Sequence, residues 1–254
     1  MGTVLLAEMT REQIRRIAPR ATVVLPTAAI EQHGPHLAIV TDTLVVTTIC
    51  QRAAEAATRE TPVVVAPPVH FGSSHHHFPH PGVLSLSSAT FTRVVVEVCD
   101  SLARSGFRRI AVINGHGGND EAIRVAAREV GLTHPELTIA ASSYWTIAHQ
   151  ALVDEGGLGE LGHLPGHAGG FETSLVMALR PELVDAASYP PALTGPPFAS
   201  DARHRPTVIR AGVSLGSGPG YTDDPSRASA EAGQRALDLI VREVAAFLVE
   251  LTRG

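Results

Sequence analysis

Short apolar runs that alternate with longer amphipathic segments constrain the fold of this chain more than any other feature. Each run has the length and composition of a buried strand and is bounded by Pro, Gly or polar residues. The predicted strands span 22–26, 61–67, 109–113 and 137–141. The predicted helices span 10–18, 43–58, 88–106, 120–130, 170–180 and 226–251. Strands alternating with helices predict an α/β fold with a mostly parallel sheet covered on both faces.

Size and charge limit the class of protein further. With 254 residues and no repeat or linker, the chain is expected to form one domain over 1–254. A net charge of −5 and the lack of a long basic run argue against nucleic acid and membrane as partners. No apolar run approaches the roughly 18 residues of a membrane span, and 1–14 lacks the apolar core of a signal peptide. Cys50 and Cys99 lie in apolar helical patterns, so we expect buried thiols and a cytoplasmic protein.

Carboxylates and imidazoles follow the first predicted strand. The sequence EQHGPHL occupies 31–37, and Asp42 comes shortly before a predicted helix. In extended backbone Glu31 and His33 project to the same face, and their oxygen and nitrogen atoms suit zinc, manganese or iron. A polar loop, with Asp42 as the cap of the helix, is the alternative.

A second cluster, NGHGGN at 114–119, follows the third predicted strand. A glycine-rich turn between strand and helix can bind phosphate, but this one matches neither dinucleotide nor P-loop spacing. Alternatively, His116 is a metal ligand, and Gly117 and Gly118 let metal and substrate approach the backbone.

The chain has 13 histidines, and several of them occupy the loop 70–82 after the second strand. This loop is either the wall of a site or a solvated surface segment. Functional loops of parallel sheets gather beyond the carboxyl ends of the strands. On this basis we expect six residues to lie close together at the carboxyl edge of the sheet: Glu31, His33, Asp42, His77, His116 and Trp145.

Three motifs in this order resemble the creatininase (creatinine amidohydrolase) family. They are EQHGPHL with Asp42, then NGHGGN, then His167 with FETS at 171–174. The resemblance, which covers about 25–184, implies an α/β/α sandwich of three layers, two divalent metal ions per subunit and usually six subunits in a ring. It also implies roles for individual residues: Glu31, His33, Asp42 and His116 as metal ligands with Asp42 bridging, His167 as acid/base group, and Tyr144 with Trp145 at the substrate.

The chain departs from the family pattern at two places. Creatininase itself carries a ligand Glu at the position of Gly118. Either Glu172 supplies this carboxylate, which we expect, or the second metal is weakly held, or one metal suffices. As another possibility, Glu172 is simply a first-turn carboxylate stabilised by the helix dipole. The second departure is in the loop 74–82, which lacks the acidic residue of the family, while His77 keeps the family histidine.

These departures argue against creatinine itself as substrate. We expect an amidohydrolase that cleaves a small cyclic amide or related C–N bond through water activated by zinc, manganese or iron. The alternatives are a hydrolase of the same family acting on a C–C, ester or peptide bond, and a non-enzymatic metal- or nucleotide-binding module. The segment 190–220, rich in Pro, Gly and Ser, is expected to be an irregular arm or lid.

Overall fold

A four-stranded parallel sheet forms the centre of the computed structural model, which describes residues 3–155, 161, 164–191 and 219–253. The strands are β1 (Thr22–Thr27), β2 (Val63–Val65), β3 (Arg109–Asn114) and β4 (Thr138–Ser143). Their order is β2-β1-β3-β4, and every pair is parallel. All four predicted strands are present, and β2 is short because prolines lie on both sides of it.

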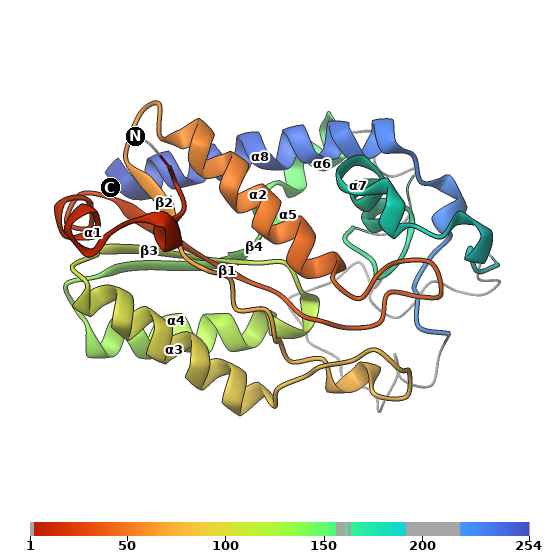
Figure 1. The fold of residues 1–254 in the computed structure, drawn as a ribbon, viewed down its shortest axis with the longest axis horizontal. Coiled ribbons are helices and arrows are strands. Elements are labelled where there is room, and N and C mark those ends of the chain that lie inside the picture. Colours follow the sequence, from red (N-terminus) through yellow and green to blue (C-terminus); the bar gives the residue numbers. More distant parts are fainter. Residues whose placement is uncertain (1–2, 156–160, 162–163, 192–218, 254) are drawn as a thin grey trace.

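Helices cover both faces of this sheet, which gives the three layers seen in Figure 1. On one face lie α2 (Thr41–Ala57), α5 (Tyr144–Ile147), α6 (His149–Asp154), α7 (Gly170–Leu179) and α8 (Ala230–Arg253). On the other face lie α3 (Ser88–Arg104) and α4 (Asp120–Thr133), while α1 (Arg11–Ile17) packs at one end. Short 3-10 turns complete the described chain: η1 (Leu6–Glu8), η2 (His75–His77), η3 (Gly117–Asn119), η5 (Pro181–Leu183), η6 (Ala186–Ser188) and η8 (Pro225–Arg227).

Side chains that alternate along β1 explain why both faces are covered. Val23 and Leu25 pack in the apolar layer under α3 and α4, whereas Val24 packs in the layer under α2 and α8. All three are fully buried. Because successive residues of a strand point to opposite faces, an apolar run must be covered on both sides.

The helix boundaries differ from the sequence predictions at two informative places. Helix α2 begins at Thr41, so Asp42 lies in its first turn instead of ahead of it, and the N-cap, Val40, makes no side-chain capping bond. The alternative interpretation of Asp42 as a helix cap is therefore wrong, since its carboxylate is directed at two histidines. Helix α8 begins at Ala230, because Pro225 starts a separate turn before it.

The order of the strands creates a switch point between β1 and β3. The chain leaves β1 through α2 toward β2 on one side, and leaves β3 through α4 toward β4 on the other. Thr27 and Asn114, at the ends of β1 and β3, lie opposite each other in the register. Crevices at such points are where open α/β sheets bind ligands, and the loops that carry Glu31 and His116 begin there.

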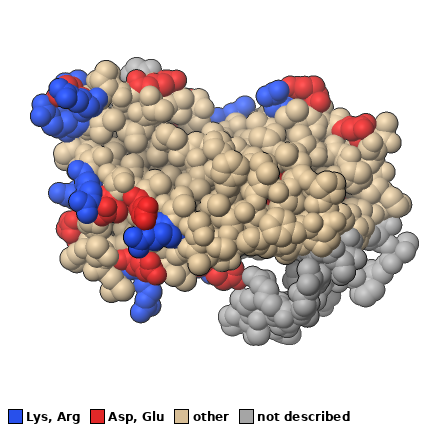
Figure 2. Space-filling view, turned by 60° about the horizontal axis from the view of Figure 1, so that its bottom comes forward, with Lys and Arg blue, Asp and Glu red and all other residues tan. Residues whose placement is uncertain are grey.

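Charge is mixed on the face of the molecule in Figure 2, where blue and red side chains lie together in small groups and the broad central area is uncharged. That face offers no extended basic surface for a polyanion. Among the described residues, no helix is both long and apolar enough to cross a bilayer. The predicted arm over 190–220 falls outside the described residues except at its two ends.

Candidate metal centre

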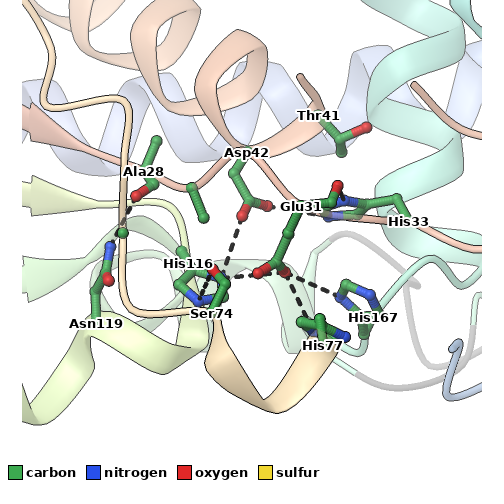
Figure 3. A network of polar contacts seen from close by, with 12 residues as sticks. Ala28, Glu31, His33, Thr41, Asp42, Ser74, His77, His116, Asn119 and His167 are labelled. Carbon is green, nitrogen blue, oxygen red and sulfur yellow. Dashed lines mark hydrogen bonds and ion pairs between the residues drawn. The ribbon is translucent and has the colours of Figure 1, made fainter. Parts of the chain in front are cut away.

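Four of the predicted metal ligands come together at the carboxyl edge of the sheet (Figure 3). Glu31 and His33 belong to the loop after β1, Asp42 to the first turn of α2, and His116 to the turn after β3. All four side chains are buried. Ligand atoms of Glu31, His33 and Asp42 lie within 4.8 Å of one another.

The turn that presents His116 is shaped by Asn114. The Asn114 amide donates to the carbonyl of His116 at 2.6 Å, and its oxygen accepts the His116 N–H at 3.1 Å. A second amide hydrogen reaches the hydroxyl of Ser143 at 2.9 Å. Gly115 lets the turn pack against α2, since a Cβ there would lie 2.6 Å from Cβ of Val46. Both features hold the imidazole of His116 at a fixed place on the sheet edge.

Asp42 lies between two histidines and offers one oxygen to each. Nε2 of His33 is 3.1 Å from Oδ1, and Nδ1 of His116 is 3.2 Å from Oδ2. Burial alone would lower the pKa of His33, but Asp42 raises it to about 10. Burial would likewise lower the pKa of His116, but Glu31 and Asp42 together raise it well above its ordinary value. When no metal ion is bound, the two imidazoles are therefore protonated, and their positive charge compensates the neighbouring carboxylates.

Glu31 faces three histidines (Figure 3). Its Oε1 lies 3.3 Å from Nε2 of His77, 3.3 Å from Nδ1 of His116 and 3.6 Å from Nδ1 of His167. Burial would raise the pKa of Glu31, but these imidazoles lower it well below its usual range. Even so, both oxygens of Glu31 and Oδ2 of Asp42 are buried without a hydrogen-bond partner. Buried carboxylate oxygens need compensation, and divalent cations fit a donor set of this kind.

Backbone carbonyls determine which ring nitrogen each histidine presents to the site. Nδ1 of His33 is 3.1 Å from the carbonyl of Glu31, and Nε2 of His116 is 3.2 Å from the carbonyl of Ser73. A carbonyl only accepts, so these nitrogens carry the hydrogen. In the neutral rings the lone pairs are then on Nε2 of His33 and on Nδ1 of His116. These are the two atoms that face Asp42.

Gln32, which no sequence pattern marks, orients two further histidines, His77 through its side chain and His167 through its backbone carbonyl. Its oxygen accepts the N–H of Gly34 at 2.9 Å, so its nitrogen donates to the carbonyl of Gly220 at 2.9 Å and to Nδ1 of His77 at 2.8 Å. Nε2 of His167 donates to the backbone carbonyl of Gln32 at 3.0 Å. His77 is thereby left with a hydrogen on Nε2, and His167 with a lone pair on Nδ1.

Glu172 lies on the other side of His33. Its carboxylate is 3.7 Å from Nε2 of His33, and it accepts the N–H of Ala168 at 2.6 Å. Burial, with a further contribution from Asp42, raises its pKa to about 8. Glu172 is thus both a first-turn carboxylate of α7 and a potential ligand beside His33.

The predicted substrate residues differ in their surroundings. Tyr144 is buried, and burial with the charges of Glu172 and Asp42 raises its pKa well above the ordinary value. Trp145 is half-buried on the apolar layer and meets Tyr144 edge-on, with ring centroids 4.9 Å apart. A Cβ added at Gly117 would meet no atom within 4 Å, so this glycine borders open space.

Two other histidines near the site, His36 and His76, each contact a neighbouring side chain. Nε2 of His36 is 2.9 Å from the hydroxyl of Thr173. His76, which the sequence left as pocket wall or solvated loop, stacks parallel to His116 with ring centroids 5.7 Å apart. No periodicity marks Gln32 or His76, because their roles depend on contacts between separate loops.

Comparisons with known proteins show which family the chain resembles. The profile of the family described as Creatininase: Creatinine amidohydrolase matches residues 7–248. The chain is 33% identical to a creatinine amidohydrolase of Pseudomonas putida, over 96% of this chain and 95% of that protein. It is 32% identical to a mycofactocin precursor peptide peptidase of Mycolicibacterium smegmatis, over 91% of this chain and 84% of that protein. A solved structure described as Creatininase Mn superposes with a TM-score of 0.76 at 29% identity, covering 98% of each chain.

Proposed function

The chain belongs to the creatininase family, and from this we infer that it is a metal-dependent amidohydrolase that hydrolyses a carbon–nitrogen bond. One observation carries this inference beyond the resemblance. Three oxygens of Glu31 and Asp42 are buried without a hydrogen-bond partner. They lie beside Nδ1 of His116 and Nδ1 of His167, the nitrogens that carry the lone pairs of these neutral rings. Carboxylates and neutral imidazoles in this arrangement bind divalent cations.

We propose two neighbouring cation sites that share Asp42. Oδ1 of Asp42, Nε2 of His33 and the carboxylate of Glu172 would hold one cation, which makes Glu172 the carboxylate that position 118 does not supply. Oδ2 of Asp42, Nδ1 of His116 and Glu31 would hold the other. Zinc, manganese or iron suits such mixed oxygen and nitrogen sets. When bound, the cations supply Lewis-acid activation of water and of the scissile carbonyl.

His167 is the proposed acid/base group. Its Nε2–H is committed to the carbonyl of Gln32, so Nδ1 is the atom that accepts and returns a proton. Burial, and then the charge of His33, lower the pKa of His167 well below its ordinary value. This shift keeps the ring neutral, with the Nδ1 lone pair unprotonated before water attacks. In the proposed role Nδ1 accepts the proton lost by the attacking water and delivers it to the leaving nitrogen. Glu172 would assist through the negative charge that it carries beside His33 once a cation is bound.

A small cyclic amide is the substrate class that we propose, supported by the similarity to creatinine amidohydrolase. The substrate would approach through the open space beside Gly117. The residues proposed to contact it are Trp145, His77, Tyr144, Gly117 and Gly118. A peptide is the second candidate, because a mycofactocin precursor peptide peptidase is similar to the chain at nearly the same identity.

Metal analysis and a substrate panel test this proposal. Purified protein is analysed for metal by mass spectrometry, stripped with a chelator, and reloaded with zinc, manganese or iron. Activity is then measured on creatinine, other cyclic amides, formamides, cyclic ketones and short peptides. We expect bound metal and metal-dependent release of an amine or acid from one amide class. His116→Ala should lose metal and activity, while the exposed His149→Ala should keep both.

Two results would contradict the proposal. A wild-type protein that binds no divalent ion at micromolar concentrations would remove the metal centre. Hydrolysis that survives complete metal removal would show that other groups activate the water. Cleavage of peptides alone would leave the centre in place and replace the cyclic amide by the second candidate.

We further propose a cytoplasmic homo-oligomer, with a hexamer as the expected assembly. The free and buried Cys50 and Cys99 support a reducing compartment, and the family resemblance supports the oligomer. Light scattering coupled to size exclusion measures the mass of the assembly directly. A monomer of 26.7 kDa would contradict the prediction.

A further inference from the structure

Three consecutive histidines follow β2, and the turn η2 directs them to three different places. A 3-10 turn has about three residues per revolution, so adjacent side chains point roughly 120° apart. His75 is exposed. His77 is buried, with Nε2 3.3 Å from Oε1 of Glu31. His76 is half-buried, and its ring lies parallel to that of His116 at an interplanar angle of 10°.

The position of His76 brings one of its ring nitrogens to the carboxylate of Glu31. Ligand atoms of Glu31, His76 and His116 all lie within 4.8 Å of one another. Both oxygens of Glu31 are buried and lack a hydrogen-bond partner. We propose that His76 is a ligand of the cation held by Glu31 and His116, an assignment that rests on the metal centre proposed above.

Neighbouring positions are less suited to supply this ligand. Gln32 donates to Nδ1 of His77, which places the hydrogen of His77 on the nitrogen that faces Glu31. At Gly118 a Cβ would lie 2.4 Å from Nε2 of His116 and 2.9 Å from Cε1 of His76. It would also lie 2.4 Å from the carbonyl oxygen of Ser73, which is backbone and cannot rotate away. Position 118 therefore cannot carry a ligand side chain unless the backbone at Ser73 moves away.

With His76 included, the two cation sites differ in their protein ligands. The site of Glu31, Asp42, His76 and His116 has two oxygen and two nitrogen ligands, enough to close a tetrahedral zinc site. The other site has His33, Asp42 and Glu172, which leaves a coordination position for water or substrate. We therefore expect one tightly bound cation and one that exchanges more readily.

His76→Phe tests the assignment, because it keeps a flat ring against His116 and removes the nitrogen. His75→Phe is the matched control in the same turn. Binding of Zn²⁺ and Co²⁺ to the full chain is measured by chelator competition, and Co²⁺ is followed by its visible absorption. We expect the control to match the wild type. His76→Phe should hold one cation at least about tenfold more weakly, with altered Co²⁺ bands, and keep the other unchanged.

The outcomes separate this assignment from the proposed function. Wild-type affinities and Co²⁺ bands in His76→Phe would overturn the role of His76 and leave the metal centre intact. A wild-type protein that binds neither ion would overturn both. Should His76→Phe unfold by circular dichroism, His76→Ala and His76→Glu replace it. Glutamate should retain the tight cation and alanine should weaken it, and equal affinity in these two variants would overturn the assignment.

Discussion

Raising the pH of the metal-free protein should destabilise it. Without metal, protons on His33 and His116 compensate the buried carboxylates, and a higher pH removes these protons. The folded pKa of His33 is about 10 and its ordinary value is 6.5. Its stabilising contribution is therefore complete below pH 6.5 and is lost as the pH rises to about 10. The raised pKa of Glu172, about 8, acts in the same direction, since the folded state prefers that carboxyl protonated.

The size of the effect follows from the shift of His33. Each pKa unit corresponds to about 1.4 kcal/mol, so His33 alone accounts for up to about 5 kcal/mol. All 20 basic residues are arginine, so no lysine titrates in this range. The raised pKa values of both cysteines and all three tyrosines add to the loss only above the ordinary cysteine value of 9.0, so the contribution of His33 is evaluated below that pH. A loss of a few kcal/mol is a large part of the total stability of a domain.

Urea denaturation measures this loss. Metal-free protein is unfolded at a series of values from about pH 6 to about pH 10, and the free energy of unfolding is obtained by linear extrapolation. His33→Gln should reduce the pH dependence substantially, whereas His149→Gln, at an exposed position, should leave it unchanged. Protein reloaded with zinc should show a much flatter profile, because cations replace the protons. A free energy that stays constant or rises over this range in metal-free protein would refute the reasoning.

Three further predictions concern residues outside the proposed ligand set. Gln32→Leu removes the side-chain amide that donates to His77 and keeps the backbone carbonyl to which His167 donates. We expect kcat on the identified substrate to fall about ten- to hundredfold with metal content retained; an unchanged kcat would refute this role. Asn114→Ala leaves several buried hydrogen-bond partners unsatisfied and should lower the free energy of unfolding, measured by urea denaturation, by about 2–4 kcal/mol. A loss below about 1 kcal/mol would show that water replaces the amide. Gly233→Ala puts a Cβ 1.8 Å from the carbonyl of Ser174 and should lower Tm, at a cost of about 1–3 kcal/mol. Its control Gly131→Ala, whose nearest neighbour is 3.8 Å away, should raise Tm slightly, and equal effects of the two would contradict the close packing of α7 on α8.

Much of the fold was predictable, because local patterns determine it. The apolar runs that became β1 to β4 are buried on both faces, and that burial requires helices on each side. The capping box at Thr10 and Gln13 and the stop at Gly106 are local signals too, and both are present in the structure. The start of α2 was placed two residues late, because the side chain of Asp42 is held by distant histidines and not by its own helix.

The candidate site divides in the same way. The sequence by itself determined that Glu31, His33, Asp42 and His116 follow strands whose carboxyl ends must meet, so their convergence followed from topology. Only the tertiary structure decided which of the adjacent histidines 75–77 faces solvent, His116 or Glu31, because neighbouring loops fix the direction of a short turn. It also decided the hydrogen positions on the imidazoles, since those depend on carbonyls and on Gln32, contributed by other segments. Residue types and strand ends are local properties of a chain, whereas ligand direction and proton position arise from contacts between loops far apart in sequence.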